Sequence, residues 1–164
     1  MKTLAADSTH TLGDYIYDAI LVAGIGGGLI ALFFLAFDTF VHGQPFLTPT
    51  LMGKVLFQGV DPASVQTVDM MAVAQFSLVH FLGFGLLGLG ISFVVHQAEM
   101  HSRHPLLVIG LVFVVLEAAF WLGITLALPG VIDRLGQLPV AAANLIAAAG
   151  VAMFFIIAHR PERS

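Results

Sequence analysis

The feature that most restricts this fold is an apolar run from residue 105 to residue 128 with one ionisable residue, Glu117, near its middle. A helix rises about 1.5 Å per residue, so a run of roughly 20 apolar residues spans the hydrocarbon core of a bilayer. A carboxylate at mid-membrane depth costs on the order of a few kcal/mol. We therefore expect Glu117 to face protein or water and to have a polar partner.

Composition places the whole chain in a membrane. Of its 164 residues 59% are hydrophobic and only 10% are charged, whereas about 25% are charged in a typical soluble domain. The net charge is −4 and the six Lys and Arg residues are scattered, which argues against nucleic acid as a partner. Because the chain has no cysteine, disulfides, thiol catalysis and Cys-ligated metals are excluded.

Four apolar runs predict an all-α bundle of four transmembrane helices in a single membrane domain, residues 1–164. The expected spans are residues 16–40, 71–95, 105–128 and 138–158. In the loop between the first two, Thr48 and Pro49 are typical of an N-cap followed by the first helical position. They predict a short helix over about 49–58 that lies at the interface or folds over the helix ends.

Several of these helices have faces of small residues, with little or no side chain. Gly24 and Gly28 form a small-xxx-small pair on the first span, and the last span has Ala143, Ala147 and Gly150 on one face. Such faces let two helices approach closely. They predict packing within the chain, self-association, or pairing with other protein subunits, in addition to contact with membrane lipid.

Basic residues at the helix ends predict the orientation. With four spans, one side of the membrane has Lys2, Arg103, Arg160 and Arg163, and the other has Lys54 and Arg134. The excess of positive charge favours cytoplasmic termini. We expect a multi-pass protein of the bacterial inner membrane, with the loop between the first two spans outside.

Polar side chains from all four spans are expected in the outer half of the bundle. Helix rise places His80 roughly 13 Å, Glu117 roughly 16 Å and Asn144 roughly 9 Å below the outer ends of their helices. Asp38 lies near the outer end of the first span. Neighbours on the same helix faces complete the candidate cluster: Trp121, Thr125 and Ser77.

Several interpretations of this cluster stay open. Glu117 and His80 could form a structural pair that fixes helix packing. They could instead line a polar outer-half cavity that handles a proton or a small ligand, with Asp38 at its mouth. A third and weaker hypothesis is a membrane enzyme that uses them as acid and base.

The same residues raise the question of a bound metal or cofactor. His80, Glu117, Asp38 and His42 supply a plausible set of nitrogen and oxygen ligands, since Asp38 and His42 are one helical turn apart. His80 is the only histidine well inside a span, which argues against a haem held by two histidines of one chain. The sequence identifies no other cofactor.

Short motifs in this order resemble a family of uncharacterised bacterial four-helix integral membrane proteins. They are Phe34-Leu-Ala-Phe-Asp38, Thr48-Pro-Thr-Leu-Met-Gly-Lys-Val-Leu-Phe57, Val79-His80-Phe81, Glu117 and His159-Arg-Pro161. The resemblance implies the four-span topology and a role for the Thr-Pro segment. It implies no substrate or cofactor.

The leading functional hypothesis from the sequence is a non-enzymatic accessory or assembly subunit of a larger membrane complex or homo-oligomer. Its basis is the small size, the thin glycine faces and the lack of a nucleophile–base constellation. The alternative is a binding or transport module for a proton, metal or small ligand, centred on Glu117 and His80.

Overall fold

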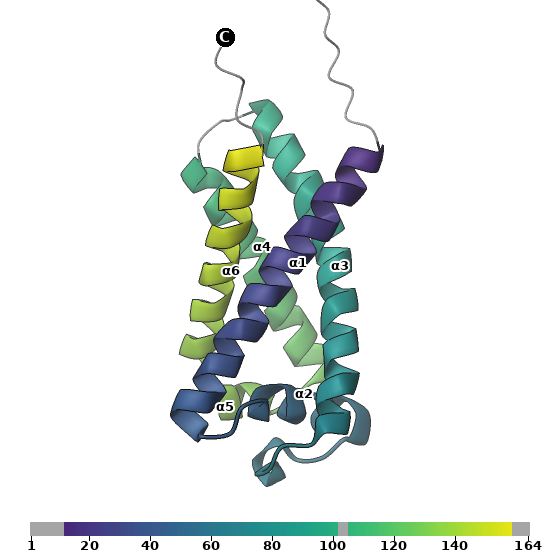
Figure 1. Ribbon diagram of the computed structural model, residues 1–164, viewed down its shortest axis with the longest axis vertical. Coiled ribbons are helices and arrows are strands. Elements are labelled where there is room, and N and C mark those ends of the chain that lie inside the picture. Colours follow the sequence, from purple (N-terminus) through teal and green to yellow (C-terminus); the bar gives the residue numbers. More distant parts are fainter. Residues whose placement is uncertain (1–11, 102–104, 159–164) are drawn as a thin grey trace, which may run out of the picture.

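The computed structural model describes residues 12–101 and 105–158, and within them it is helical with no strand. The long helices form one bundle, and short helices lie at one of its ends (Figure 1). The helices are α1 (Leu12–Phe37), α2 (Leu47–Gln58), α3 (Met70–His101), α4 (Pro105–Ala127), α5 (Val131–Leu135) and α6 (Gln137–Ala158). We refer to the end that holds α2 and α5 as the α2 end.

Four of these helices are long and apolar enough to cross a membrane. The qualifying segments are Tyr15–His42, Met70–Val94, Gly110–Ala127 and Gln137–Ile157. The predicted all-α bundle of four spans is thus confirmed, and the chain is a multi-pass membrane protein. The basic residues Lys2, Arg103, Arg160 and Arg163 lie outside the described residues, so the cytoplasmic position of the termini stays a prediction.

Helix α1 crosses the bundle diagonally and contacts both α3 and α6, while α4 packs on α6 (Figure 1). Helix α1 approaches α3 closely where Gly88 of α3 lies against the backbone of Ala19. Further along, the ring of Phe84 covers Gly26 and Gly27, with its Cγ 3.0 Å from the Cβ position of Gly27. From there α1 and α3 diverge toward the α2 end (Figure 1).

Gly24 and Gly28 do not pack closely against another helix of the described chain. A Cβ added at Gly24 or Gly28 would meet nothing within 4 Å. Both residues instead line an open groove between α1 and α6. The last span behaves as predicted, because Ala143 and Ala147 are buried.

Helix α2 folds over the ends of the spans, which is one of the two arrangements expected from the sequence. Its buried side chains share a hydrophobic cluster with Phe34 of α1, Ile124 of α4 and Val140 of α6, and Gly53 lies directly on the backbone of Ala72 in α3. Its N-terminus corrects the sequence prediction. Phe46, with φ of 70°, precedes the first helical residue Leu47, and Thr48 lies inside the first turn rather than at the N-cap.

Candidate functional site

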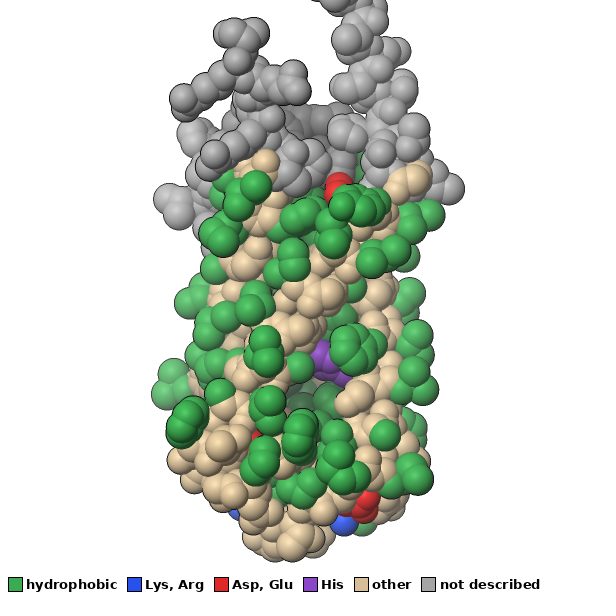
Figure 2. Space-filling view, viewed as in Figure 1, with side chains coloured by type: hydrophobic (Ala, Val, Ile, Leu, Met, Phe, Trp, Pro, Cys, Tyr) green, Lys and Arg blue, Asp and Glu red, His purple; other side chains and the backbone are tan. Residues whose placement is uncertain are grey.

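A cavity of about 340 Å³ lies in the middle of the bundle, on the α2 side of the point where α1 and α3 diverge. Figure 2 shows a hollow in the surface of the bundle at this place, with a histidine side chain at its edge. Pro49 and Met52 of α2 form one wall, and α4 and α6 contribute Ala119 and Val140. The cavity's size is at the lower end of the range for small-molecule sites, about 300–1,000 Å³.

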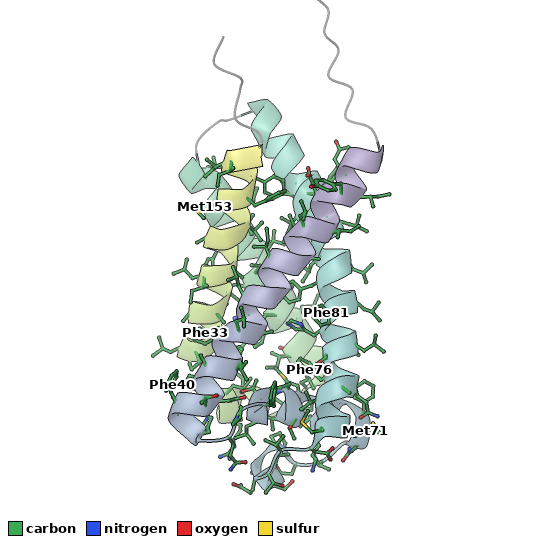
Figure 3. All side chains as sticks on the ribbon, in the orientation of Figure 1. Phe33, Phe40, Met71, Phe76, Phe81 and Met153 are labelled. Carbon is green, nitrogen blue, oxygen red and sulfur yellow. The ribbon has the colours of Figure 1, made fainter. Side chains whose placement is uncertain are left out.

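The cavity wall is almost wholly apolar. Besides aliphatic side chains it includes six aromatic rings, those of Phe34, Phe46, Phe76, Phe81, Phe84 and Phe120. In Figure 3, Phe76 and Phe81 lie in the space between the ribbons of α1 and α3. The polar residues on its wall are Thr48, Ser77, His80 and Asn144.

His80 is the polar group of this cavity best placed to recognise a ligand. Residues four apart on a helix share a face, so Phe76, His80 and Phe84 of α3 all point toward α1. The imidazole centroid lies 4.8 Å from that of Phe84, 5.8 Å from Phe76 and 5.9 Å from Phe81. No hydrogen bond joins the imidazole to any other residue of ranges 12–101 and 105–158.

A neutral imidazole offers one hydrogen-bond donor and one acceptor. Neither nitrogen of His80 is among the buried side-chain polar atoms that lack a hydrogen bond in residues 12–101 and 105–158. The nitrogens are therefore unpaired and reachable from the cavity. They can bond a hydroxyl, carbonyl or carboxyl group of a molecule that occupies it.

Glu117 has the partners that its depth required, and they come from α4 and α6. Its Oε1 accepts a hydrogen bond of 2.9 Å from Asn144 Nδ2, and its Oε2 accepts one of 3.1 Å from Trp121 Nε1. Asn144 is buried and also lines the cavity, whereas Glu117 and Trp121 do not. Thr125 lies exposed on the same face of α4.

The expected pairing of Glu117 with His80 is not found. Within the described chain no hydrogen bond or ion pair joins them. Helix rise predicted a similar depth for the two side chains, but Glu117 bonds to Asn144 of α6 while His80 packs on Phe84 and faces α1. The hypothesis of an acid–base pair made of these two side chains is therefore wrong in its geometry.

Asp38 does not lie at the mouth of a polar cavity, which is where the sequence predicted it. It is fully buried in a π-helical turn, Asp38–His42, that ends α1. Its Oδ2 accepts the Thr48 N–H at 2.6 Å and its Oδ1 accepts the Thr48 hydroxyl at 2.7 Å. Both oxygens thus join the end of α1 to the start of α2.

The proposed metal ligands are not brought together. Asp38 is bonded to Thr48, Glu117 to Asn144 and Trp121, and the exposed His42 ring packs edge-on against Phe37 at 5.4 Å. Across ranges 12–101 and 105–158, no three His, Asp or Glu side chains are grouped to hold a metal ion. We correct the predicted ligand set accordingly.

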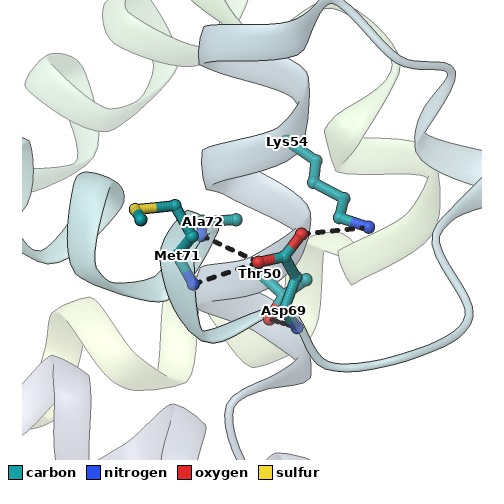
Figure 4. A network of polar contacts seen from close by, with 5 residues as sticks. All are labelled: Thr50, Lys54, Asp69, Met71 and Ala72. Carbon is teal, nitrogen blue, oxygen red and sulfur yellow. Dashed lines mark hydrogen bonds and ion pairs between the residues drawn. The ribbon is translucent and has the colours of Figure 1, made fainter.

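Sequence reasoning missed a polar network that fastens α2 to the start of α3 (Figure 4). Asp69 caps α3 by accepting the N–H groups of Met71 at 3.0 Å and Ala72 at 3.3 Å. It also pairs with Lys54 at 3.4 Å, and its own N–H donates to the Thr50 hydroxyl. The signal was present, since an Asp directly before an apolar run is a typical N-cap.

Hydrogen bonding favours the ionised form of Asp69. The Ala72 N–H, joined by the Met71 N–H and the Lys54 ammonium, lowers the pKa of the Asp69 carboxyl below its ordinary value. Because α2 forms a wall of the cavity, the Asp69 network and the Asp38–Thr48 bonds position that wall from both sides.

Comparison with known proteins gives no family assignment. The resemblance to uncharacterised four-helix membrane proteins therefore stays a prediction. No protein-family model matches this chain, and neither a curated protein nor a solved structure shows a significant match to it.

Proposed function

We propose that the protein is a binding module for a small apolar molecule that carries one hydrogen-bonding group. The observation behind this proposal is the cavity of about 340 Å³, walled by aromatic and aliphatic side chains around the unpaired imidazole of His80. Apolar pockets with a few placed polar groups are typical ligand sites. The centre of the site is His80, with Asn144 and Ser77 on its wall, rather than Glu117.

The bilayer is the natural source of such a ligand. The cavity lies beside the gap between α1 and α3 (Figure 2), and both helices are membrane spans. The α2 end is covered by α2 itself, most of whose side chains are buried. A molecule dissolved in the membrane would thus reach His80 sideways between α1 and α3.

A matched pair of probes tests this function. We would follow 4-fluoro-1-naphthol and 1-fluoronaphthalene by ¹⁹F NMR with the full chain in lipid nanodiscs. The naphthol should bind the wild type about 2- to 10-fold more tightly than His80→Phe, the worth of one hydrogen bond of about 0.5–1.5 kcal/mol. The probe without a hydroxyl group, 1-fluoronaphthalene, cannot form that bond and should bind both proteins equally.

A cavity-filling variant supplies the control. Ala119 lines the cavity, so Ala119→Phe should weaken both probes together by occupying their space. If Ala119→Phe changes neither affinity, the probes bind elsewhere. If His80→Phe leaves the naphthol affinity unchanged, the imidazole has no part in recognition.

An accessory or assembly subunit is the second candidate function, supported by the open glycine groove. Gly24 and Gly28 on α1 face Gly150 and Met153 on α6 across a groove that the chain leaves unfilled. In membranes such small-residue surfaces commonly receive another helix. The groove also fits self-association into a homo-oligomer.

Oligomeric state in nanodiscs, measured by native mass spectrometry, tests this second candidate. Gly28→Ile should disrupt an assembly formed through the groove without destabilising the monomer, because nothing lies within 4 Å of its Cβ position. Gly83→Ile on α3 is the matched control, since its Cβ position is equally open. A wild type that is monomeric in its own membrane would exclude self-association.

A further inference from the structure

One face of α4 is exposed around the carboxylate of Glu117. Residues Gly110, Val114, Trp121 and Thr125 are all exposed, and Glu117 between them is half-buried. Their spacing of three and four residues places them on one side of the helix. We call these five residues the Glu117 stripe. It is separate from the cavity, whose wall includes none of them.

The Glu117 carboxylate has hydrogen bonds but no counter-charge among the residues that the structure describes. Both donors, Asn144 and Trp121, are neutral. The four candidate spans contain no Lys or Arg, and the two described basic residues, Lys54 and Arg134, lie in α2 and α5 at the α2 end. Ionisable groups inside membranes usually pair with an opposite charge or line an aqueous path.

A second copy of this chain cannot supply the missing charge at that depth. A two-fold interface places the same patch on both subunits, so it would bring two Glu117 carboxylates together. Their repulsion opposes such a dimer. Side-by-side copies in the same orientation would keep Lys54 and Arg134 at the α2 end, away from the middle of the spans.

We propose that the Glu117 stripe docks a transmembrane helix of a different protein, one that carries a Lys or Arg at the depth of Glu117. Gly110 and Thr125 are small enough at the ends of the stripe for close approach. The docked cation would meet a carboxylate that Asn144 and Trp121 already hold in place. This inference concerns the exposed face of α4 and does not depend on the ligand cavity.

The chain contains a built-in reporter of this docking. Trp121 is its only tryptophan, it is 38% exposed, and its indole N–H donates to Glu117. A tryptophan-free helix that covers the stripe would change the environment of this one indole. Its fluorescence therefore reports contact at the stripe and not elsewhere on the protein.

The experiment uses two synthetic Leu/Ala helices of spanning length, without tryptophan, that differ only at the central residue, Lys in one and norleucine in the other. Titrated into nanodiscs that hold the full chain, the Lys helix should shift Trp121 fluorescence and bind about tenfold more tightly than the norleucine helix. Glu117→Gln should remove this preference without changing norleucine binding.

Two results would overturn the proposal. One is equal binding of both helices to the wild type, a comparison that needs no variant and so holds even if Glu117→Gln fails to fold. The other is a Lys preference that survives in Glu117→Gln, which would place the acceptor on another surface. Ala119→Phe, which fills the cavity, should bind the Lys helix as the wild type does.

Discussion

Asp38 joins two helices through a single side chain. It is fully buried, and its two oxygens accept the N–H and the hydroxyl of Thr48 at 2.6 and 2.7 Å. Hydrogen bonds to a buried carboxylate are among the stronger ones in proteins. They hold the first turn of α2 against the end of α1, next to Phe46 in its left-handed conformation.

Replacing Asp38 by Asn should therefore destabilise the fold by about 1–3 kcal/mol, since the new amide group faces two donors with one acceptor too few. Denaturation in mild detergent measures the change. Thr39→Ala is the matched control, because Thr39 is exposed and its hydroxyl bonds only to Leu35 of the same helix. Equal loss in both variants would mean that Asp38 does not anchor α2.

Asp69 predicts how stability depends on pH. Its folded pKa is lowered, first by the Ala72 N–H and then by Met71 and Lys54. A lowered pKa contributes stability above the unfolded pKa of about 3.9 that is lost as pH falls through the folded value. Unfolding measured between about pH 2 and 5 should show this loss in the wild type and a weaker one in Asp69→Asn.

Lys54→Met separates the two causes of that pH dependence. It removes the ion pair but leaves the N–H groups of Ala72 and Met71, so most of the acid-induced loss should remain. If Lys54→Met flattens the pH profile as much as Asp69→Asn does, the ion pair and not the helix cap controls the Asp69 carboxyl.

Among the elements, only one of the four glycines Gly83, Gly85, Gly88 and Gly90 of α3 packs against α1. Gly88 lies against the Ala19 carbonyl, whereas Gly83, Gly85 and Gly90 have nothing within 4 Å of their Cβ positions. Gly88→Ala should therefore force the helices apart and cost about 1–3 kcal/mol. Gly85→Ala should be neutral or slightly stabilising. Equal stability of the two variants in detergent unfolding would contradict this packing.

The four spans and α2 were predictable because each is encoded locally, whereas the short helix α5 and the π-helical turn at Asp38–His42 were not predicted. Apolar length predicted the four spans, and the Thr48-Pro49 pair predicted α2 within two residues of its start at Leu47. Which glycines make contact was not predictable. Neither Gly24 nor Gly27 has a side chain, so the sequence does not distinguish them. Phe84 covers Gly27 and not Gly24 because of the way α1 crosses α3.

For the whole molecule, the direction in which each polar side chain points was not predictable from the sequence. Helix rise placed His80 and Glu117 at similar depths, but each residue turns the helix by about 100°, and the rotation of a span depends on its neighbours. As α1 crosses α3 at Gly88 and then diverges, a space opens that His80 faces from α3. Glu117 on α4 faces Asn144 of α6 instead.

This arrangement predicts that the cavity opens to the bilayer and not to water. Because the chain has no cysteine, Ser77→Cys places a single thiol on the cavity wall and Thr67→Cys places one in the exposed loop before α3. In vesicles we would measure, for each thiol, the ratio of its reaction rate with an uncharged maleimide to its rate with a charged thiol reagent. This ratio should be at least about tenfold higher at position 77 than at position 67, since hydrocarbon excludes charge. Ala147→Cys, at a fully buried position, should react with neither reagent. Equal ratios at positions 77 and 67 would show that the cavity connects to water past α2, and the ligand would then come from solution.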